Sequence, residues 1–292
     1  MKIKNIYRSL SIIFCLTTGL LLAVVPTAQE FLQAIEENNV DALAVMLEQG
    51  VDIDLSLNEY GETALMIAVK LGHLAMVELL LESNNNAQID FKDEYGFTPL
   101  MLSAQYGHAH MVQLLLNRGA RIDFEVLQSD EDNSGLTACM LAAQHGKASV
   151  VDLLLDHGAI VDHRDTEGWT ALMLAVLNCY SDVIKTILTH KSNKAQIDLQ
   201  VPDSDKHYGG MTAFYIAMKE KRIDDAQLLL RHGADYSIKS LTDNNLLEVF
   251  ETVREKALAE VALHNDYRHK NKNIALTIMS LESQIAKNKI VF

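Results

Sequence analysis

The strongest constraint on this chain is a motif that recurs five times at similar spacing. Each copy starts with a threonine followed by small and apolar residues, and a glycine lies two positions before the threonine. The threonines are Thr63, Thr98, Thr137, Thr170 and Thr212, separated by 35, 39, 33 and 42 residues. A period near 33 residues indicates a repeat architecture, in which small units stack on their neighbours instead of enlarging one core.

Each unit predicts two helices joined by a tight turn. Threonine is a favourable helix N-cap, and Pro99 suits the first helical position. About ten residues later an apolar run rich in leucine predicts the second helix. Isoleucine-aspartate pairs such as Ile122-Asp123 predict an extended return to the next unit. Glycines should end the helices, namely Gly72, Gly107 and Gly146 after the first helix and Gly119, Gly158 and Gly233 after the second.

Thr-Ala-Leu or Thr-Pro-Leu heads three of these units, and the chain resembles the ankyrin-repeat family over about residues 29–263. The resemblance implies an all-α fold, a solenoid of helix-turn-helix units with short β-hairpin loops. Segments 29–57 and 243–263 are degenerate units that we interpret as caps, and 264–292 is expected to form a C-terminal helical tail. The longer spacings predict insertions at residues 126–133 and 200–208, at the tips of hairpins.

One column departs from the family pattern. The family usually has a histidine after Thr-Pro-Leu, which hydrogen-bonds the turn. In four of the five units of this chain a methionine occupies that position, and a methionine cannot donate the bond. We therefore expect slightly weaker anchoring of the turn without a change of fold. We interpret the column as core and not as a copper-ligand set. Its members are Met66, Met101, Met140, Met173 and Tyr215.

Residues 1–28 have the layout of a secretory signal peptide. Three basic residues within the first eight positions precede an apolar run at residues 10–25. That run is short for a membrane span, which needs about 20 residues. We predict cleavage after Ala28, export to the periplasm or the exterior, and no membrane insertion afterwards. The alternative is an uncleaved anchor formed by residues 10–25.

The charge distribution argues against nucleic acid as a partner. The formal net charge is −14, and residues 1–28 contain three bases and no acid, which leaves 22 bases against 39 acids in the rest of the chain. A negative surface repels phosphate backbones. Solubility is the simpler explanation of this excess, and selection of a basic partner is the alternative.

No catalytic, metal or cofactor motif is present in the sequence. A glycine-rich phosphate loop, a nucleophile elbow, a zinc-protease helix and paired cysteine-histidine spacings are all missing. Cys139 and Cys179 are expected to be small buried thiols. We interpret the histidines at helix ends as structural, namely His73, His108, His157, His190 and His232. We therefore predict a non-enzyme, monomeric and without a cofactor.

The family resemblance implies that partners bind at the hairpin tips and the concave face. The position between the glycine and the threonine holds large apolar residues in four of five units, including the only tryptophan. Exposed apolar and aromatic side chains usually mark interaction sites. We therefore expect Trp169→Ala to weaken partner capture with little change in melting, the alternative being that these side chains pack between hairpins. The predicted partner-binding residues are Tyr60, Glu62, Tyr95, Phe97, Tyr106, Leu136, Trp169, Tyr208 and Met211.

The sequence thus predicts an exported, non-catalytic module that binds a protein partner. The alternative is a secreted effector that binds a protein of another cell. A catalytic tail at 264–292 is disfavoured, because 29 residues are too few to build a core around a site.

Overall fold

The computed structural model describes residues 26–82, 87–126, 134–191, 195–205 and 207–235. These residues belong to two compact units, with the boundary between Phe91 and Lys92. The segment 1–25, the second cap at 243–263, the tail at 264–292 and nearly all of the first insertion lie outside the described residues. The described residues form twelve helices, none of which is both long and apolar enough to cross a membrane.

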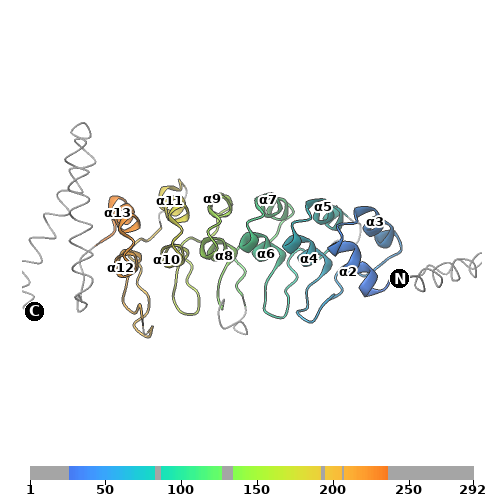
Figure 1. The fold of residues 1–292 in the computed structure, drawn as a ribbon, viewed down its shortest axis with the longest axis horizontal. Coiled ribbons are helices and arrows are strands. Elements are labelled where there is room, and N and C mark those ends of the chain that lie inside the picture. The colour runs from blue at the N-terminus through green and yellow to red at the C-terminus, as the bar shows by residue number, and fades with distance from the viewer. Residues whose placement is uncertain (1–25, 83–86, 127–133, 192–194, 206, 236–292) are drawn as a thin grey trace, which may run out of the picture. The chain divides into compact units, whose positions relative to one another are not determined.

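The described residues of unit 1 form two helix pairs, which Figure 1 shows in blue to cyan. The first pair covers most of the segment at 29–57 that we interpreted as a degenerate unit. Its core includes Phe31, Ile35 and Leu43, all fully buried. Helix α2 packs on α4, and α3 packs on α5. The bounds are α2 Ala28–Glu36, α3 Val40–Glu48, α4 Ala64–Leu71 and α5 Leu74–Glu82.

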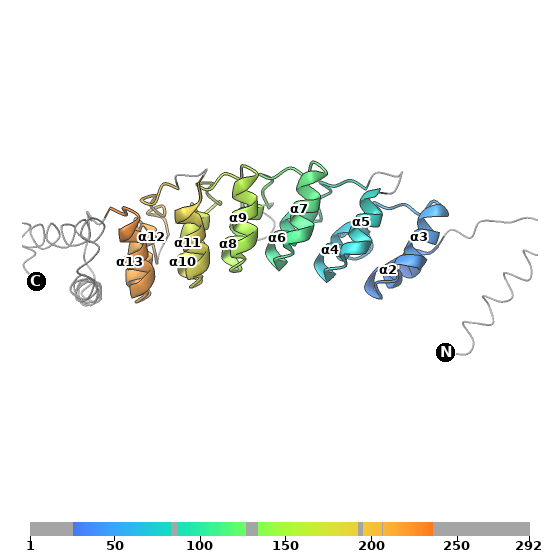
Figure 2. The same cartoon turned by 90° about the horizontal axis from the view of Figure 1, so that it is seen from above.

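The described residues of unit 2 form four helix pairs. Its even-numbered helices pack in one row and its odd-numbered helices in a second, and the long loops extend beyond the even-numbered row (Figures 1 and 2). We call the even-numbered helices of unit 2, with the loops that precede them, the tip side. The bounds are α6 Pro99–Tyr106, α7 Ala109–Asn117, α8 Ala138–Gln144, α9 Ala148–Asp156, α10 Ala171–Leu177, α11 Ser181–Thr189, α12 Ala213–Lys219 and α13 Ile223–Arg231.

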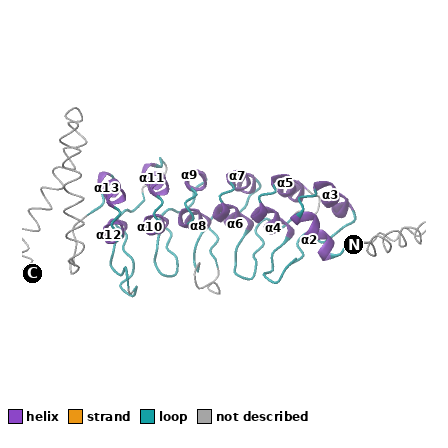
Figure 3. Ribbon diagram, in the orientation of Figure 1, coloured by secondary structure: helices purple, strands orange, loops and turns teal. Residues whose placement is uncertain are grey.

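The prediction of an all-helical solenoid is confirmed. The segments that return the chain from one repeat to the next, however, are turns and not extended segments (Figure 3). Ile122-Asp123 and its equivalents all lie in turns. An isolated bridge between Gln200 and Thr212 is the only β pairing in the described part of the chain.

Aspartates in these turns link one repeat to the next. Each carboxylate accepts a backbone N–H from the following repeat: Asp54 from Gln88 at 2.9 Å in unit 1, and Asp162 from Gln196 at 3.0 Å in unit 2. Asp198 does the same for the amide 37 residues later, at 2.7 Å. Burial raises the pKa of Asp162 and Asp198, with the donated N–H groups opposing it. These bonds satisfy loop amides that no strand would pair.

The threonine N-caps are confirmed in four of the five repeats, where the hydroxyl oxygen accepts from the amide three residues later. In the fifth unit Thr212 makes no such bond, and its buried Oγ1 has no partner among the described residues. The methionine column is buried core, as predicted. The sulfur of Met101 accepts from the Thr98 amide at 3.4 Å, so this side chain still contacts the helix start.

Helix α2 begins at Ala28 and is capped by Thr27. The Thr27 hydroxyl accepts from the Glu30 amide, and the Glu30 carboxylate accepts from the Thr27 amide, both at 3.2 Å. This reciprocal capping box satisfies two amides that the helix leaves unpaired. A cut after Ala28 would remove the cap together with the preceding segment.

We expect Thr27→Ala to lower the free energy of unfolding by about 1 kcal/mol, because the loss of an N-cap typically has that effect. A chain that starts at Gln29 should lose at least as much relative to one that starts at Pro26, since its ammonium group also opposes the helix dipole. Urea unfolding followed by circular dichroism measures both differences. The cap has no stabilising role if Thr27→Ala is as stable as its parent and the chain that starts at Gln29 is as stable as the one that starts at Pro26.

The two described cysteines are free, with Cys139 buried and Cys179 exposed. The prediction that both are buried was therefore wrong for Cys179. This residue lies in the turn between α10 and α11 with φ of 69°, where other units place Gly72, Gly107 and Gly146. The left-handed turn points the side chain outward, so its thiol does not reach the core.

We expect Cys179→Gly to raise the free energy of unfolding by up to about 1 kcal/mol. The left-handed conformation costs a non-glycine residue about 1–2 kcal/mol, and the greater freedom of glycine in the unfolded chain offsets part of that gain. Cys179→Ser, which keeps the β-carbon, should leave stability unchanged in the same urea titration. A glycine variant less stable than the serine variant would refute the explanation.

Candidate protein-binding surface

Three of the loop tips are each built on one polar side chain. Asp93 accepts from the backbone N–H groups two and four residues later, at 3.0 and 2.8 Å, and Asp165 does so at 2.9 and 2.8 Å. Asn58 forms the same pair of bonds in unit 1, at 3.1 Å each. The second of these amides belongs to the residue just before the N-cap threonine. Our sequence reasoning missed these side chains, although an Asn or Asp four residues before that position is a readable signal.

Neighbouring tips in unit 2 also contact one another. The Thr166 hydroxyl donates to the Ser134 carbonyl at 3.0 Å, and the Arg164 guanidinium donates to the Gln200 carbonyl at 2.6 Å. A ring nitrogen of His163 lies 3.2 Å from the Gly135 carbonyl oxygen. The tips therefore form a packed layer and are not independent loops.

This layer buries most residues of the column that we expected to be exposed. Phe97, Leu136 and Trp169 retain only 7%, 2% and 5% of their accessible surface, whereas Met211 is partly exposed. The expectation of exposed apolar anchors was thus wrong for these three residues. Their side chains are covered within the tip layer, where burial of apolar area is favourable, so the packing alternative describes them.

Glu62, the charged member of that column, is engaged within unit 1. Its carboxylate accepts from the Lys70 ammonium at 2.6 Å and from the Asn58 side-chain amide at 2.7 Å. These groups line a cavity of about 240 Å³ with Leu32 and Leu71. Since its carboxylate is already paired, Glu62 lacks the free charge that a partner-binding role would use.

Three of the four predicted tyrosines are the exposed part of the surface. Tyr60 in unit 1 and Tyr95 and Tyr106 on the tip side of unit 2 keep 46%, 39% and 45% of their surface accessible. Tyr106 stacks on His108, with 6.1 Å between ring centroids. Exposed aromatic rings suit protein recognition, because they bury a large area on binding and have few rotatable bonds.

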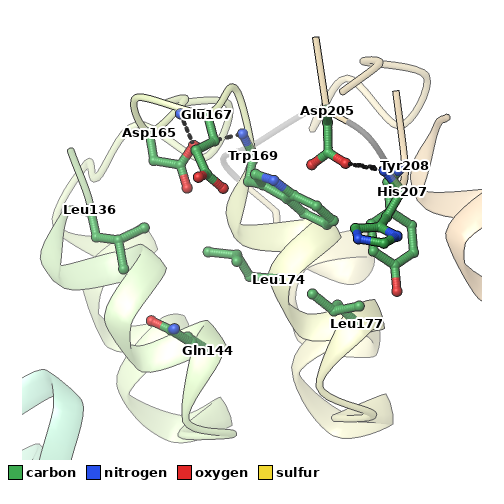
Figure 4. Close-up of a pocket in the computed structure, with 10 residues that line it drawn as sticks. All are labelled: Leu136, Gln144, Asp165, Glu167, Trp169, Leu174, Leu177, Asp205, His207 and Tyr208. Carbon is green, nitrogen blue, oxygen red and sulfur yellow. Dashed lines mark hydrogen bonds between the residues drawn. The ribbon is translucent and has the colours of Figure 1, made fainter. Parts of the chain in front are cut away.

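A pocket of about 190 Å³ lies between successive tips of unit 2 (Figure 4). It brings together three of the predicted partner-binding residues, each from a different repeat. The rings of Trp169 and Tyr208 meet edge to face with their centroids 5.3 Å apart. Leu136 faces them from the repeat that precedes that of Trp169. The full lining is Leu136, Gln144, Asp165, Glu167, Trp169, Leu174, Leu177, Asp205, His207 and Tyr208.

Tyr208 is held by its own repeat. Its hydroxyl donates to the Glu220 carboxylate at 2.8 Å, and the Lys219 ammonium lies 4.6 Å from its ring centroid while donating to the His207 carbonyl. These bonds anchor the second insertion, at 200–208, to helix α12. The insertion does fall at a hairpin tip, as the spacing predicted.

The carboxylates of the pocket differ in their proton affinity. Partial burial raises the pKa of Asp165. The backbone N–H groups of Trp169 and Glu167, which donate to this carboxylate, oppose that rise. Partial burial has the same tendency at Asp205, but N–H groups of Tyr208 and His207 and the nearby Trp169 lower the pKa of Asp205 below its ordinary value. Asp205 is therefore ionised at neutral pH.

Alkaline pH should destabilise this part of the fold. Burial and the adjacent Glu220 raise the pKa of Tyr208 to about 12, and burial raises that of Tyr215 as well. An unfolded tyrosine ionises near pH 10, so the folded state binds more protons above that pH and stability falls as pH rises from about 10 to 12. Urea unfolding at several pH values should show this decline, with a shallower slope in Tyr208→Phe. An identical slope in that variant would contradict the assignment.

The histidines at helix ends contact neighbouring groups. The Nε2 atom of His190 lies 3.1 Å from an Asp156 carboxylate oxygen, and the Nδ1 atom of His157 lies 2.8 Å from the Leu153 carbonyl oxygen. Within the described ranges, no group of three or more His, Cys, Asp or Glu side chains is arranged to hold a metal ion.

Comparison with known proteins agrees with this architecture. A family model described as ankyrin repeats (3 copies) matches residues 31–126 and 123–203, which is more than half of the chain. A search of curated proteins found no match. The chain therefore belongs to the ankyrin-repeat family.

Proposed function

We propose that this protein is a non-catalytic interaction module that binds a protein partner through the tip side of unit 2. Ankyrin repeats are protein–protein interaction modules, and the family match supports that general role. The observation that carries the proposal is the combination of exposed Tyr95 and Tyr106 with an aromatic and acidic pocket on the same row of helices and loops. Aromatic side chains are enriched in binding hot spots.

Site-specific photo-crosslinking tests this proposal. A photoreactive phenylalanine derivative placed at Tyr95 or Tyr106 should form a covalent product with the same protein from the native cell. The matched control is the same derivative at Asp182, which is exposed on the odd-numbered row. Products of equal yield from Asp182, or none from either tyrosine position, would refute binding through the tip side.

Export from the cytoplasm is a second part of the proposal, supported by the basic, apolar and small-residue layout of residues 1–28. A fusion of this segment to alkaline phosphatase, which folds only in an oxidising compartment, should be active in a bacterial host. Leu16→Arg, which interrupts the apolar run, should abolish that activity. Activity of the arginine variant equal to that of the parent would contradict export.

The location of the exported protein separates the two versions of this function. Recovery from the periplasm supports a binding module of the cell envelope, whereas recovery from the medium supports the alternative, an effector that binds a protein of another cell. Mass spectrometry of the same sample would establish whether cleavage follows Ala28.

A further inference from the structure

We infer that the pocket between the tips of unit 2 receives an arginine side chain of the partner protein. This inference rests on the proposed function and names the chemistry that its site would recognise. The pocket, at about 190 Å³, is smaller than the 300–1,000 Å³ typical of small-molecule sites. Its size therefore suits one side chain that projects from a larger partner.

Hydrogen-bond acceptors dominate the polar lining. Asp165, Glu167 and Asp205 contribute carboxylates, and no lysine or arginine in the described parts of the chain forms an ion pair with any of them. Arg164, next to Asp165 in the chain, donates to the Gln200 carbonyl, and Lys219 donates to the His207 carbonyl. Within the described residues the pocket thus offers three carboxylates that form no ion pair with a lysine or arginine.

Gln144 provides an independent observation. Its Oε1 atom is buried and has no hydrogen-bond partner among the described residues. A buried acceptor without a donor is unfavourable, so a ligand that supplies an N–H group there would restore a bond. The carboxylates come from the tip loops, whereas Gln144 comes from the end of α8 (Figure 4). The ligand must therefore present donors in more than one direction.

A guanidinium group meets these requirements better than an ammonium group. It is planar, carries five N–H donors in a fixed fork, is weakly hydrated, and packs favourably against aromatic rings. Trp169 and Tyr208 supply the aromatic wall, and Leu174 and Leu177 supply apolar surface for the methylene stem. The excess of 39 acidic over 22 basic residues beyond position 28 would also attract a basic partner segment.

Fluorescence of the single tryptophan tests this assignment directly, because Trp169 lines the pocket and the chain has no other. The full chain is titrated with N-acetyl-arginine amide at neutral pH and low ionic strength. We expect a saturating fluorescence change with a dissociation constant in the millimolar range. N-acetyl-citrulline amide has a similar shape without the charge, and N-acetyl-lysine amide has the charge without the fork. Both should bind about tenfold or more weakly.

Two matched variants localise the binding. Glu167→Gln removes one carboxylate while keeping the backbone N–H that Asp165 accepts, and should weaken arginine amide binding about tenfold. Glu78→Gln makes the same change on α5 of unit 1, where Glu78 is exposed, and should have no effect. Circular dichroism confirms that both variants fold.

Three results would overturn the inference: no saturating change with arginine amide, equal binding of the citrulline or lysine amide, or unchanged binding in Glu167→Gln. The titration uses no partner protein. Its failure would therefore leave a positive crosslinking result at Tyr95 and Tyr106 intact, and the proposed function would stand without the arginine pocket. Loss of crosslinking would instead remove the function on which the pocket depends.

Discussion

Trp169→Ala is expected to lower the free energy of unfolding by about 3–5 kcal/mol, the range found when a buried aromatic side chain is removed. Trp169 is 5% exposed and packs edge to face on Tyr208, so truncation leaves a cavity between two tips. Urea unfolding followed by far-ultraviolet circular dichroism measures the loss, because the variant has no tryptophan fluorescence. This expectation replaces the sequence-based one of nearly unchanged melting.

Tyr95→Ala is the control for this variant. Tyr95 also occupies a tip, but 39% of its surface is exposed, and surface substitutions usually change stability by less than about 0.5 kcal/mol. If Trp169→Ala and Tyr95→Ala unfold at the same urea concentration, Trp169 does not support the tip layer.

Gly168→Ala is expected to lower the free energy of unfolding by about 2–4 kcal/mol. Gly168 has φ of 84°, and a β-carbon added to it would lie 2.5 Å from Cγ of Pro202 in the next tip. The left-handed backbone accounts for about 1 kcal/mol of this loss, and overpacking against the rigid proline ring for about 1–3 kcal/mol more. The measurement is again urea unfolding by circular dichroism.

Gly158→Ala separates these two contributions. Gly158 has a similar φ of 89°, but an added β-carbon would meet no atom within 4 Å. Its alanine variant should therefore lose only the backbone contribution, about 1 kcal/mol. Similar losses at both glycines would show that contact between neighbouring tips contributes little to stability.

Local signals in the sequence predicted the architecture well. The threonine N-caps, the terminating glycines and the apolar stripes all act over a few residues, so each helix could be placed from its own segment. The methionine column was also assigned correctly to the core, because the apolar residue recurs at the same place in the first helix of each repeat. Such features recur in every unit, and the repetition strengthens each assignment.

Orientation at the tips could not be predicted in the same way. Whether Trp169 faces water or a neighbour depends on the next tip, which begins more than 30 residues later. Cys179 was misplaced for a related reason, since the left-handed turn that directs it outward is normally signalled by a glycine. The aspartates that join successive repeats pair with amides 34–37 residues away, beyond the reach of local pattern.

The sequence by itself therefore determined the repeat, its two helices and the residues that cap them, because these depend on hydrogen bonds and periodicity within one unit. Tertiary structure decided which tip residues are buried, which tyrosines remain exposed, and that Leu136, Trp169 and Tyr208 line one pocket with Gln144. Those outcomes depend on packing between units, where side chains from three repeats compete for the same space.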